Sequence, residues 1–201
     1  MSTRGLYGFR VGGVDKLAFN QCDSYPEGLG LGVKEFLDAI AMDDDGISAI
    51  AKGIVLVHEE ARPTPAQVGG LRSLGIKVPE PEPEGELDWY HALRSVQGDL
   101  IACGCGLRYM TDGRDFLTSI YCEWVYVLDT DTHMLEVHRG GNGNPKAAGR
   151  YASRLGDVIC GEQTYGPSLI AAVTFEGVRR LSSRSFLEML ACEENCSWIE
   201  A

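Results

Sequence analysis

The chain has 201 residues, of which 44% are hydrophobic and 23% are charged. A chain of this length can bury on the order of 70% of the surface that its unfolded form exposes, so we expect one globular domain over residues 1–201 rather than a disordered or disulfide-stapled chain. The net charge of -11 argues against a nucleic-acid partner, because binding to phosphates depends on clustered Lys and Arg side chains.

The sequence also predicts the cellular compartment of the protein. No apolar run reaches the roughly 18 residues that a membrane span needs, and the polar start at Met1–Gly5 does not form the apolar core of a signal peptide. The seven cysteines are odd in number and irregularly spaced, which favours reduced thiols. We therefore expect a cytoplasmic protein with no membrane partner, and the sequence leaves its oligomeric state open.

The first predicted element is a β-hairpin over residues 6–19, with a two-residue turn at Gly12–Gly13. Counting outward from a turn of this length fixes the register of the two strands. The register gives the cross-strand pairs Val11–Val14, Arg10–Asp15, Leu6–Phe19 and Gly5–Asn20. Both faces of the hairpin carry apolar residues, so we expect it to lie inside a larger sheet.

The next segments predict helices separated by a short strand. Apolar residues recur at helical spacing over residues 29–40, and the acidic triplet Asp43–Asp45 that follows predicts a solvated turn. Ile54–Val57 predicts a strand, with the end of a second helix as the alternative. Thr64 and Gln67 stand at the spacing of a capping box, which predicts a helix start.

The middle of the chain begins with an acidic, Pro-rich connector at 79–85, whose alternating Pro and Glu predict an extended conformation. Asp88 and Asp99 are predicted N-caps of two further helices. Residues 121–129 and 134–138 are rich in aromatic and β-branched side chains and predict a second, central hairpin.

A turn-rich loop at 140–145, a strand at 169–175 and a final helix from Ser183 complete the pattern. His133 and His138 flank the return strand of the central hairpin and are predicted to be surface histidines. Because hairpins and helices occur without regular βαβ alternation, we predict an α+β fold. Its sheet is expected to be mostly antiparallel, with N-terminal and central β-hairpins packed against several helices.

The candidate binding site is the stretch at residues 20–30, which combines hydrogen-bonding side chains with turn formers directly after a strand. The hairpin register brings the residue before Gly5 beside this stretch, and a helix that begins near Leu29 is expected to offer free N–H groups. The alternative is a structural turn whose side chains bond the backbone. The predicted site residues are Arg4, Asn20, Asp23, Ser24 and Tyr25.

An enzymatic alternative rests on the N-terminus. Removal of Met1 would expose Ser2, and a terminal Ser followed by a hairpin is typical of N-terminal-nucleophile amidohydrolases, in which the α-amino group acts as the base. No nucleophile-elbow motif occurs, and nothing places a His beside Ser24. The spacings of Cys103–Cys105 and Cys192–Cys196 match no zinc finger, so we predict no metal and no cofactor.

Several short segments of the chain carry recognisable motifs. They are Thr3-Arg4-Gly5, Asn20 to Gly30 with its Asp-Ser-Tyr-Pro-x-Gly-Leu-Gly motif, Asp88-Trp89-Tyr90, Leu93-Arg94, Gln97-Gly98, and Cys122-Glu123-Trp124 with Tyr126 and Asp129. In these segments, which span most of the chain, the protein resembles an uncharacterised family of bacteria, their phages and fungi. The resemblance implies no activity, because the family carries no assigned one.

No complete catalytic constellation can be assembled from the sequence. We therefore favour a binding or interaction domain whose ligand is an unknown protein or small molecule. The resemblance is consistent with a phage-encoded protein, because the family occurs in phages.

Overall fold

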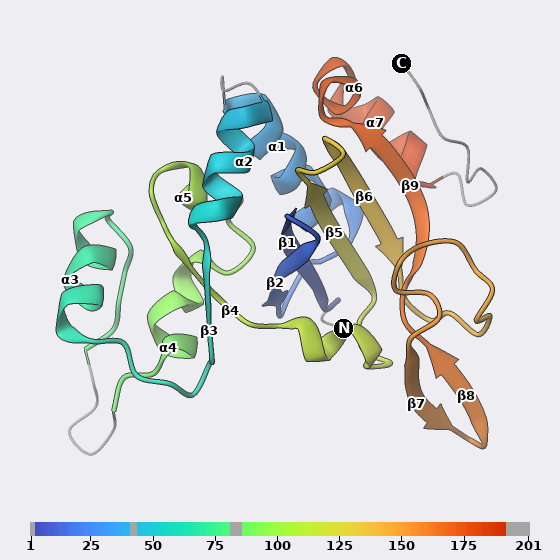
Figure 1. The fold of residues 1–201 in the computed structure, drawn as a ribbon, viewed down its shortest axis with the longest axis horizontal. Coiled ribbons are helices and arrows are strands. Elements are labelled where there is room, and N and C mark those ends of the chain that lie inside the picture. Colours follow the sequence, from blue (N-terminus) through green and yellow to red (C-terminus); the bar gives the residue numbers. More distant parts are fainter. Residues whose placement is uncertain (1–2, 41–43, 81–85, 192–201) are drawn as a thin grey trace.

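The computed structural model describes residues 3–40, 44–80 and 86–191 of the chain. Its centre is a five-stranded sheet with the strand order β2-β1-β5-β6-β9 (Figure 1). Only β1 and β5 run parallel, and every other pair of neighbours is antiparallel. The strands are β1 (Gly5–Val11), β2 (Val14–Asn20), β5 (Trp124–Asp129), β6 (Met134–Arg139) and β9 (Ser168–Thr174). The predicted α+β fold is confirmed, with an open mixed sheet.

Both predicted hairpins are confirmed. In the first, Arg10 pairs with Asp15 and Gly5 pairs with Asn20, as the turn geometry predicts. The Gly12–Gly13 turn has φ values of 58° and 74°, the left-handed region that a two-residue turn of this kind needs. The parallel contact between β1 and β5 was not predicted, because hairpin geometry alone does not determine which later strand joins β1.

Helices cover one face of the sheet. Their buried side chains share a hydrophobic core with Phe9, Tyr126 and Leu128 of the sheet. The helices that contribute to this core from both ends of the chain are α1 (Leu31–Ala39), α2 (Asp44–Gly53), α5 (Leu100–Gly104), α6 (Phe175–Arg180) and α7 (Ser183–Ala191). Within the described ranges, no helix has the length and apolarity needed to cross a bilayer.

The opposite face of the sheet has a smaller core of its own. Leu6, Leu17 and Val127 of the strands pack there with Leu117 of the 3₁₀-helix Arg114–Thr118 and with Tyr151. The chain between β6 and β7 therefore lies on this face. Consequently the sheet is covered on both sides, which explains why the N-terminal hairpin is apolar on both faces.

A further group of elements lies to one side of the sheet (Figure 1). It comprises a parallel strand pair, β3 (Val55–Val57) with β4 (Tyr109–Thr111), and the helices α3 (Pro65–Ser73), α4 (Trp89–Leu93) and the 3₁₀-helix Arg94–Val96. Thr64 makes both hydrogen bonds of the predicted capping box. Asp88 and Asp99 cap α4 and α5 by accepting backbone N–H groups. All three predicted helix starts are confirmed.

Other predictions differ from the structure. Asp44 and Asp45 form the first turn of α2 rather than a solvated turn, because carboxylates are favoured at the positive end of a helix dipole. Asp43, and residues 81–85 of the predicted connector, lie outside the described residues. His138 is fully buried rather than on the surface.

Two further elements were not predicted. One is α6, which follows β9 directly and is too short to show a clear helical period. The other is a third hairpin, β7 (Leu155–Ile159) with β8 (Glu162–Tyr165), whose residues are mostly exposed and so lack the alternation of a half-buried strand.

Candidate functional site

Two residues of the predicted site, Asn20 and Ser24, are buried, with 7% and 0% of their surface exposed. The Asn20 side-chain amide donates to the Ser24 hydroxyl at 2.8 Å and to the Cys22 carbonyl at 2.5 Å. The Ser24 carbonyl in turn accepts the Tyr126 hydroxyl of β5 at 3.1 Å. These side chains form an internal framework that fixes the loop after β2 against the sheet.

The remaining predicted residues lie on the surface of the same region. Asp23 and Tyr25 are exposed. Asp23 has a φ of 54°, in the left-handed region, which turns the chain away from β2. The Arg4 guanidinium carbon lies 5.6 Å from the centre of the Tyr121 ring, and none of the ion pairs among the described residues joins Arg4 to Asp23. The structure thus brings Asn20, Asp23 and Ser24 together and directs Arg4 elsewhere.

The free N–H groups predicted at the start of the helix are already bonded. The chain makes a wide helical turn over Pro26–Gly30 before α1 begins. The Leu29 N–H donates to the Asp23 carbonyl at 2.8 Å, and the Gly30 N–H donates to the Tyr25 carbonyl at 3.4 Å. The expected free N–H groups are therefore not available at Leu29 and Gly30, because the backbone of the loop closes on itself.

A groove of about 340 Å³ lies beside this loop, between it and the segment at residues 97–101. Asn20, Asp23 and Glu35 line it from one side, and Gln97 and Asp99 line it from the other. The groove is open to solvent. Two residues of the site that the sequence predicts, Asn20 and Asp23, line it, and its second wall comes from a segment almost 80 positions further along the chain.

The two walls of the groove are fixed to one another. The Gln97 side-chain oxygen accepts the Gln21 N–H at 3.3 Å, and the buried Tyr7 hydroxyl accepts the Gly98 N–H. Gly98 has a φ of 83°, and a Cβ there would lie 2.9 Å from the Asn20 side-chain oxygen. A glycine is therefore required where the second wall meets the end of β2.

Two further glycines, Gly28 and Gly32, line the groove. Gly28 packs so closely that a Cβ would lie 2.1 Å from the Asp23 carbonyl oxygen. Gly32, in the first turn of α1, has no atom within 4 Å of the position that its Cβ would occupy, so its surface faces open space. Leu29, Leu100 and Ile101 supply the apolar part of the wall. A ligand can therefore contact both backbone and apolar side chains there.

The electrostatic character of the groove is acidic. Asp23, Glu35 and Asp99 are its charged residues, and its lining contains no Lys or Arg. Across the part of the chain that the structure describes, no group of three His, Cys, Asp or Glu side chains is placed to share a metal ion. The carboxylates are spread along the groove, which suits the ammonium of a Lys or the guanidinium of an Arg.

A second polar cluster lies on the other face of the sheet, and sequence reasoning missed most of it. Strand register aligns Asp15 of β2, Arg10 of β1 and Asp129 of β5 in one row. Glu136 and His138 of β6 stand on the same face, opposite Val127 and Val125. A partial signal was present in the sequence, because Asp15 and Asp129 each stand two residues from a core residue of this face, Leu17 and Val127. Only the Arg10–Asp15 pair, 2.7 Å apart, was predicted.

Arg150 ties this cluster together. Its guanidinium contacts both Asp129 and Glu136, whose side chains are 2% and 14% exposed. Burial alone would raise the pKa of the Glu136 carboxyl, but hydrogen bonds from His138 and Arg150 outweigh burial and lower that pKa. The cluster contains as many carboxylates as guanidinium groups once Arg10 and Arg154 are included, so it is a neutral network rather than a charged patch.

The chain was compared with protein-family models, curated proteins and solved structures. None of them matches it. The resemblance drawn from the motifs stays a hypothesis, and Ser2, on which the amidohydrolase alternative depends, lies outside the described residues.

Proposed function

We propose that this chain is a binding module that holds a cationic segment of a partner protein in the groove beside Asp23, Glu35 and Asp99. The observation that carries the proposal is the composition of this groove of about 340 Å³, which has three carboxylates and no basic side chain in its lining. A Lys or Arg side chain of the partner would place its charge among the carboxylates. Its methylene stem would lie along Ile101, the exposed apolar side chain of the lining.

The rigidity of the groove supports this role. Binding is weakened by the cost of ordering mobile groups, and a wall that is already hydrogen-bonded avoids most of that cost. Asn20 and Ser24 hold one wall, and Gln97 and Gly98 hold the other. An open groove covers less of a small molecule than an enclosed pocket does, so it favours a segment of a larger partner.

The net charge of the whole chain supports the same class of partner. A charge of -11 attracts cationic surfaces over long distances and repels nucleic acid. We place the protein in the cytoplasm, because Cys103, Cys105, Cys122 and Cys160 are free thiols and a reducing compartment would keep them so.

The first test neutralises the groove without changing its shape. The triple variant Asp23→Asn, Glu35→Gln, Asp99→Asn keeps the size of each side chain. Asn is tolerated at the left-handed φ of position 23 and is a good N-cap at position 99. Peptides selected from a random library on the wild-type chain are expected to be rich in Lys and Arg, and to bind the triple variant about tenfold more weakly or worse. Calorimetry measures both affinities.

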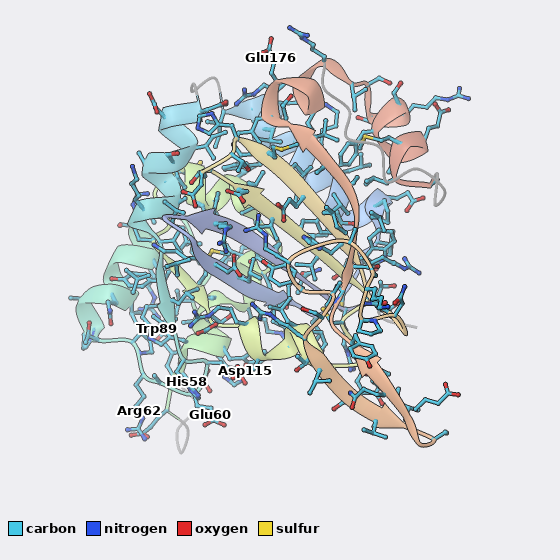
Figure 2. All side chains as sticks on the ribbon, turned by 45° about the vertical axis from the view of Figure 1, so that its right-hand side comes forward. His58, Glu60, Arg62, Trp89, Asp115 and Glu176 are labelled. Carbon is cyan, nitrogen blue, oxygen red and sulfur yellow. The ribbon has the colours of Figure 1, made fainter. Side chains whose placement is uncertain are left out.

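The matched control removes three carboxylates far from the groove, with Glu60→Gln, Glu162→Gln and Glu176→Gln. Figure 2 shows Glu60 and Glu176 at opposite ends of the molecule, and all three side chains are exposed. This control has the same net charge as the triple variant and should bind the selected peptides like the wild type. An equal loss of affinity in both variants would show that only the overall charge of the chain matters. If the library yields no cationic peptides, the proposal is refuted.

A further inference from the structure

The chain between β6 and β7 forms a strap, defined here as residues 141–154, that crosses the face of the sheet bearing His138 (Figure 1). The Arg150 guanidinium contacts Asp129 and Glu136, and Arg154 lies 4.0 Å from Asp15. The ring of Tyr151 packs in the core beneath the strap, 4.8 Å from the ring of His138 between centroids. The strap contains no helix or strand, and it is held by these side chains together with backbone hydrogen bonds that its Asn142, Ala148 and Arg154 carbonyls accept.

His138 lies sealed beneath this strap. Its side chain has 0% of its surface exposed, and its Nε2 lies 3.1 Å from a Glu136 carboxylate oxygen. Its Nδ1 has no hydrogen-bond partner. The strap residue Gly149 covers that nitrogen so closely that a Cβ on Gly149 would lie 3.2 Å from it. In the neutral ring Nε2–H donates to Glu136, and the lone pair of Nδ1 points at the strap.

Protonation of the ring would place a second N–H donor and a positive charge against the strap. No acceptor in the closed structure can receive that N–H, and an unsatisfied buried donor is costly. Water could reach Nδ1 only if Gly149 moved away. Protonation of His138 and lifting of the strap are therefore coupled.

We propose that the strap is an acid-sensitive latch, closed while His138 is neutral and released when the ring is protonated. Four groups face His138. Glu136 of β6 and Asp15 of β2 favour the protonated ring, whereas Arg150 of the strap opposes it and Tyr151 of the strap covers it. Burial outweighs the two carboxylates, so the pKa of His138 lies below its ordinary value of 6.5 in the closed state.

The lowered pKa of His138 determines how the stability of the closed strap depends on pH. In the open strap the ring is hydrated and titrates near 6.5, and in the closed strap it titrates lower. The closed state is therefore fully favoured above that pH and loses stability as the pH falls below it.

Release would affect a second groove, of about 400 Å³, which is separate from the acidic one. Gly141, Asn142 and Gly143 at the start of the strap form one wall of it, and residues of the β7–β8 hairpin form the other. The Asn142 side-chain amide also donates to the Ala152 carbonyl near the end of the strap, at 3.1 Å. Lifting the strap would therefore move the wall that Gly141, Asn142 and Gly143 form, so the latch gives this end of the molecule a pH-dependent shape.

The test is hydrogen exchange of strap peptides, read by mass spectrometry and corrected for intrinsic rates. In the wild-type chain the open population of the strap is expected to rise about tenfold for each pH unit below 6.5, because opening is coupled to the uptake of one proton. His138→Gln keeps a donor for Glu136 but cannot be protonated, so its strap exchange should be independent of pH. His133→Gln removes an exposed histidine paired with Asp44 and should behave as the wild type.

Exchange that is independent of pH in the wild type, or equally pH-dependent in His138→Gln, would overturn the latch. Should His138→Gln fail to fold, the NMR titration of His138 in the wild type decides the question. A pKa well below 6.5 supports the latch, and an ordinary pKa contradicts it.

Discussion

Replacing Arg150 with methionine is expected to lower the free energy of unfolding by about 3 kcal/mol, the lower end of the cost of breaking a buried ion pair. Most of this cost comes from the buried carboxylates that are left without Arg150, and less from the loss of the ion pairs themselves. Asp129 and Glu136 would keep their charges in a largely buried site, with Arg10 at 3.8 Å as the nearest remaining partner of Asp129. Arg150 is itself 24% exposed, which keeps the expected loss away from the upper end of the range.

The pH dependence distinguishes this mechanism from simple loss of packing. In the wild type the pKa of Glu136 is lowered, so its contribution to stability is present above its ordinary pKa and is lost as the pH falls. In Arg150→Met the Glu136 carboxylate loses the guanidinium while its burial remains, so its pKa should rise and the variant gains stability as the pH falls. Urea denaturation at pH 7 and pH 4.5 should therefore show the gap between the two proteins narrowing in acid.

Arg184→Met provides the control, because Arg184 pairs with Glu188 on an exposed face of α7 and should cost less than about 0.5 kcal/mol. Adding Asp129→Asn and Glu136→Gln to Arg150→Met should recover part of the loss. An Arg150→Met protein as stable as Arg184→Met would show that the cluster does not hold the strap.

Substituting Gly5 with alanine is expected to cost about 3 kcal/mol, at the upper end of overpacking effects. A Cβ at this position would lie 2.4 Å from the Trp124 carbonyl oxygen and 2.8 Å from the Ser24 Cβ. The carbonyl belongs to the backbone of β5 and cannot swing away, so the β1–β5 contact would have to separate. The loop that carries Asp23 would move with it, and binding to the acidic groove should weaken together with stability.

Gly143→Ala makes the same chemical change where no atom lies within 4 Å of the added Cβ. Its midpoint in thermal unfolding should stay within about 2 °C of the wild type. If Gly5→Ala unfolds at the same temperature as Gly143→Ala, the close approach of β1 to β5 and to the Ser24 loop is refuted.

Local chemistry accounts for the parts of the fold that could be predicted. A Gly-Gly turn fixes its own register, so the pairing of Arg10 with Asp15 follows from the sequence. The caps at Thr64, Asp88 and Asp99 are equally local. The parallel contact between β1 and β5 joins residues about 120 positions apart, and no short-range pattern encodes it.

The candidate site was predicted in part for the same reason. The side chains after β2 are polar, as a binding site requires. However, Asn and Ser can equally well contact a partner or make hydrogen bonds within a loop. Only the structure shows Asn20 and Ser24 buried and Asp23 exposed. The second wall of the groove, with Gln97 and Asp99, comes from a distant segment that the sequence does not bring near.

A cationic segment bound in the acidic groove would lie against Gly32. Alanine at this position adds a methyl to open space in α1 and should stabilise the chain by about 0.5–1 kcal/mol, whereas arginine would fill the groove with a positive charge. The deciding measurement is the affinity of a library-selected peptide for Gly32→Ala and Gly32→Arg. We predict wild-type affinity for the alanine variant and at least about a tenfold loss for the arginine variant, and equal affinity for both would contradict the claim.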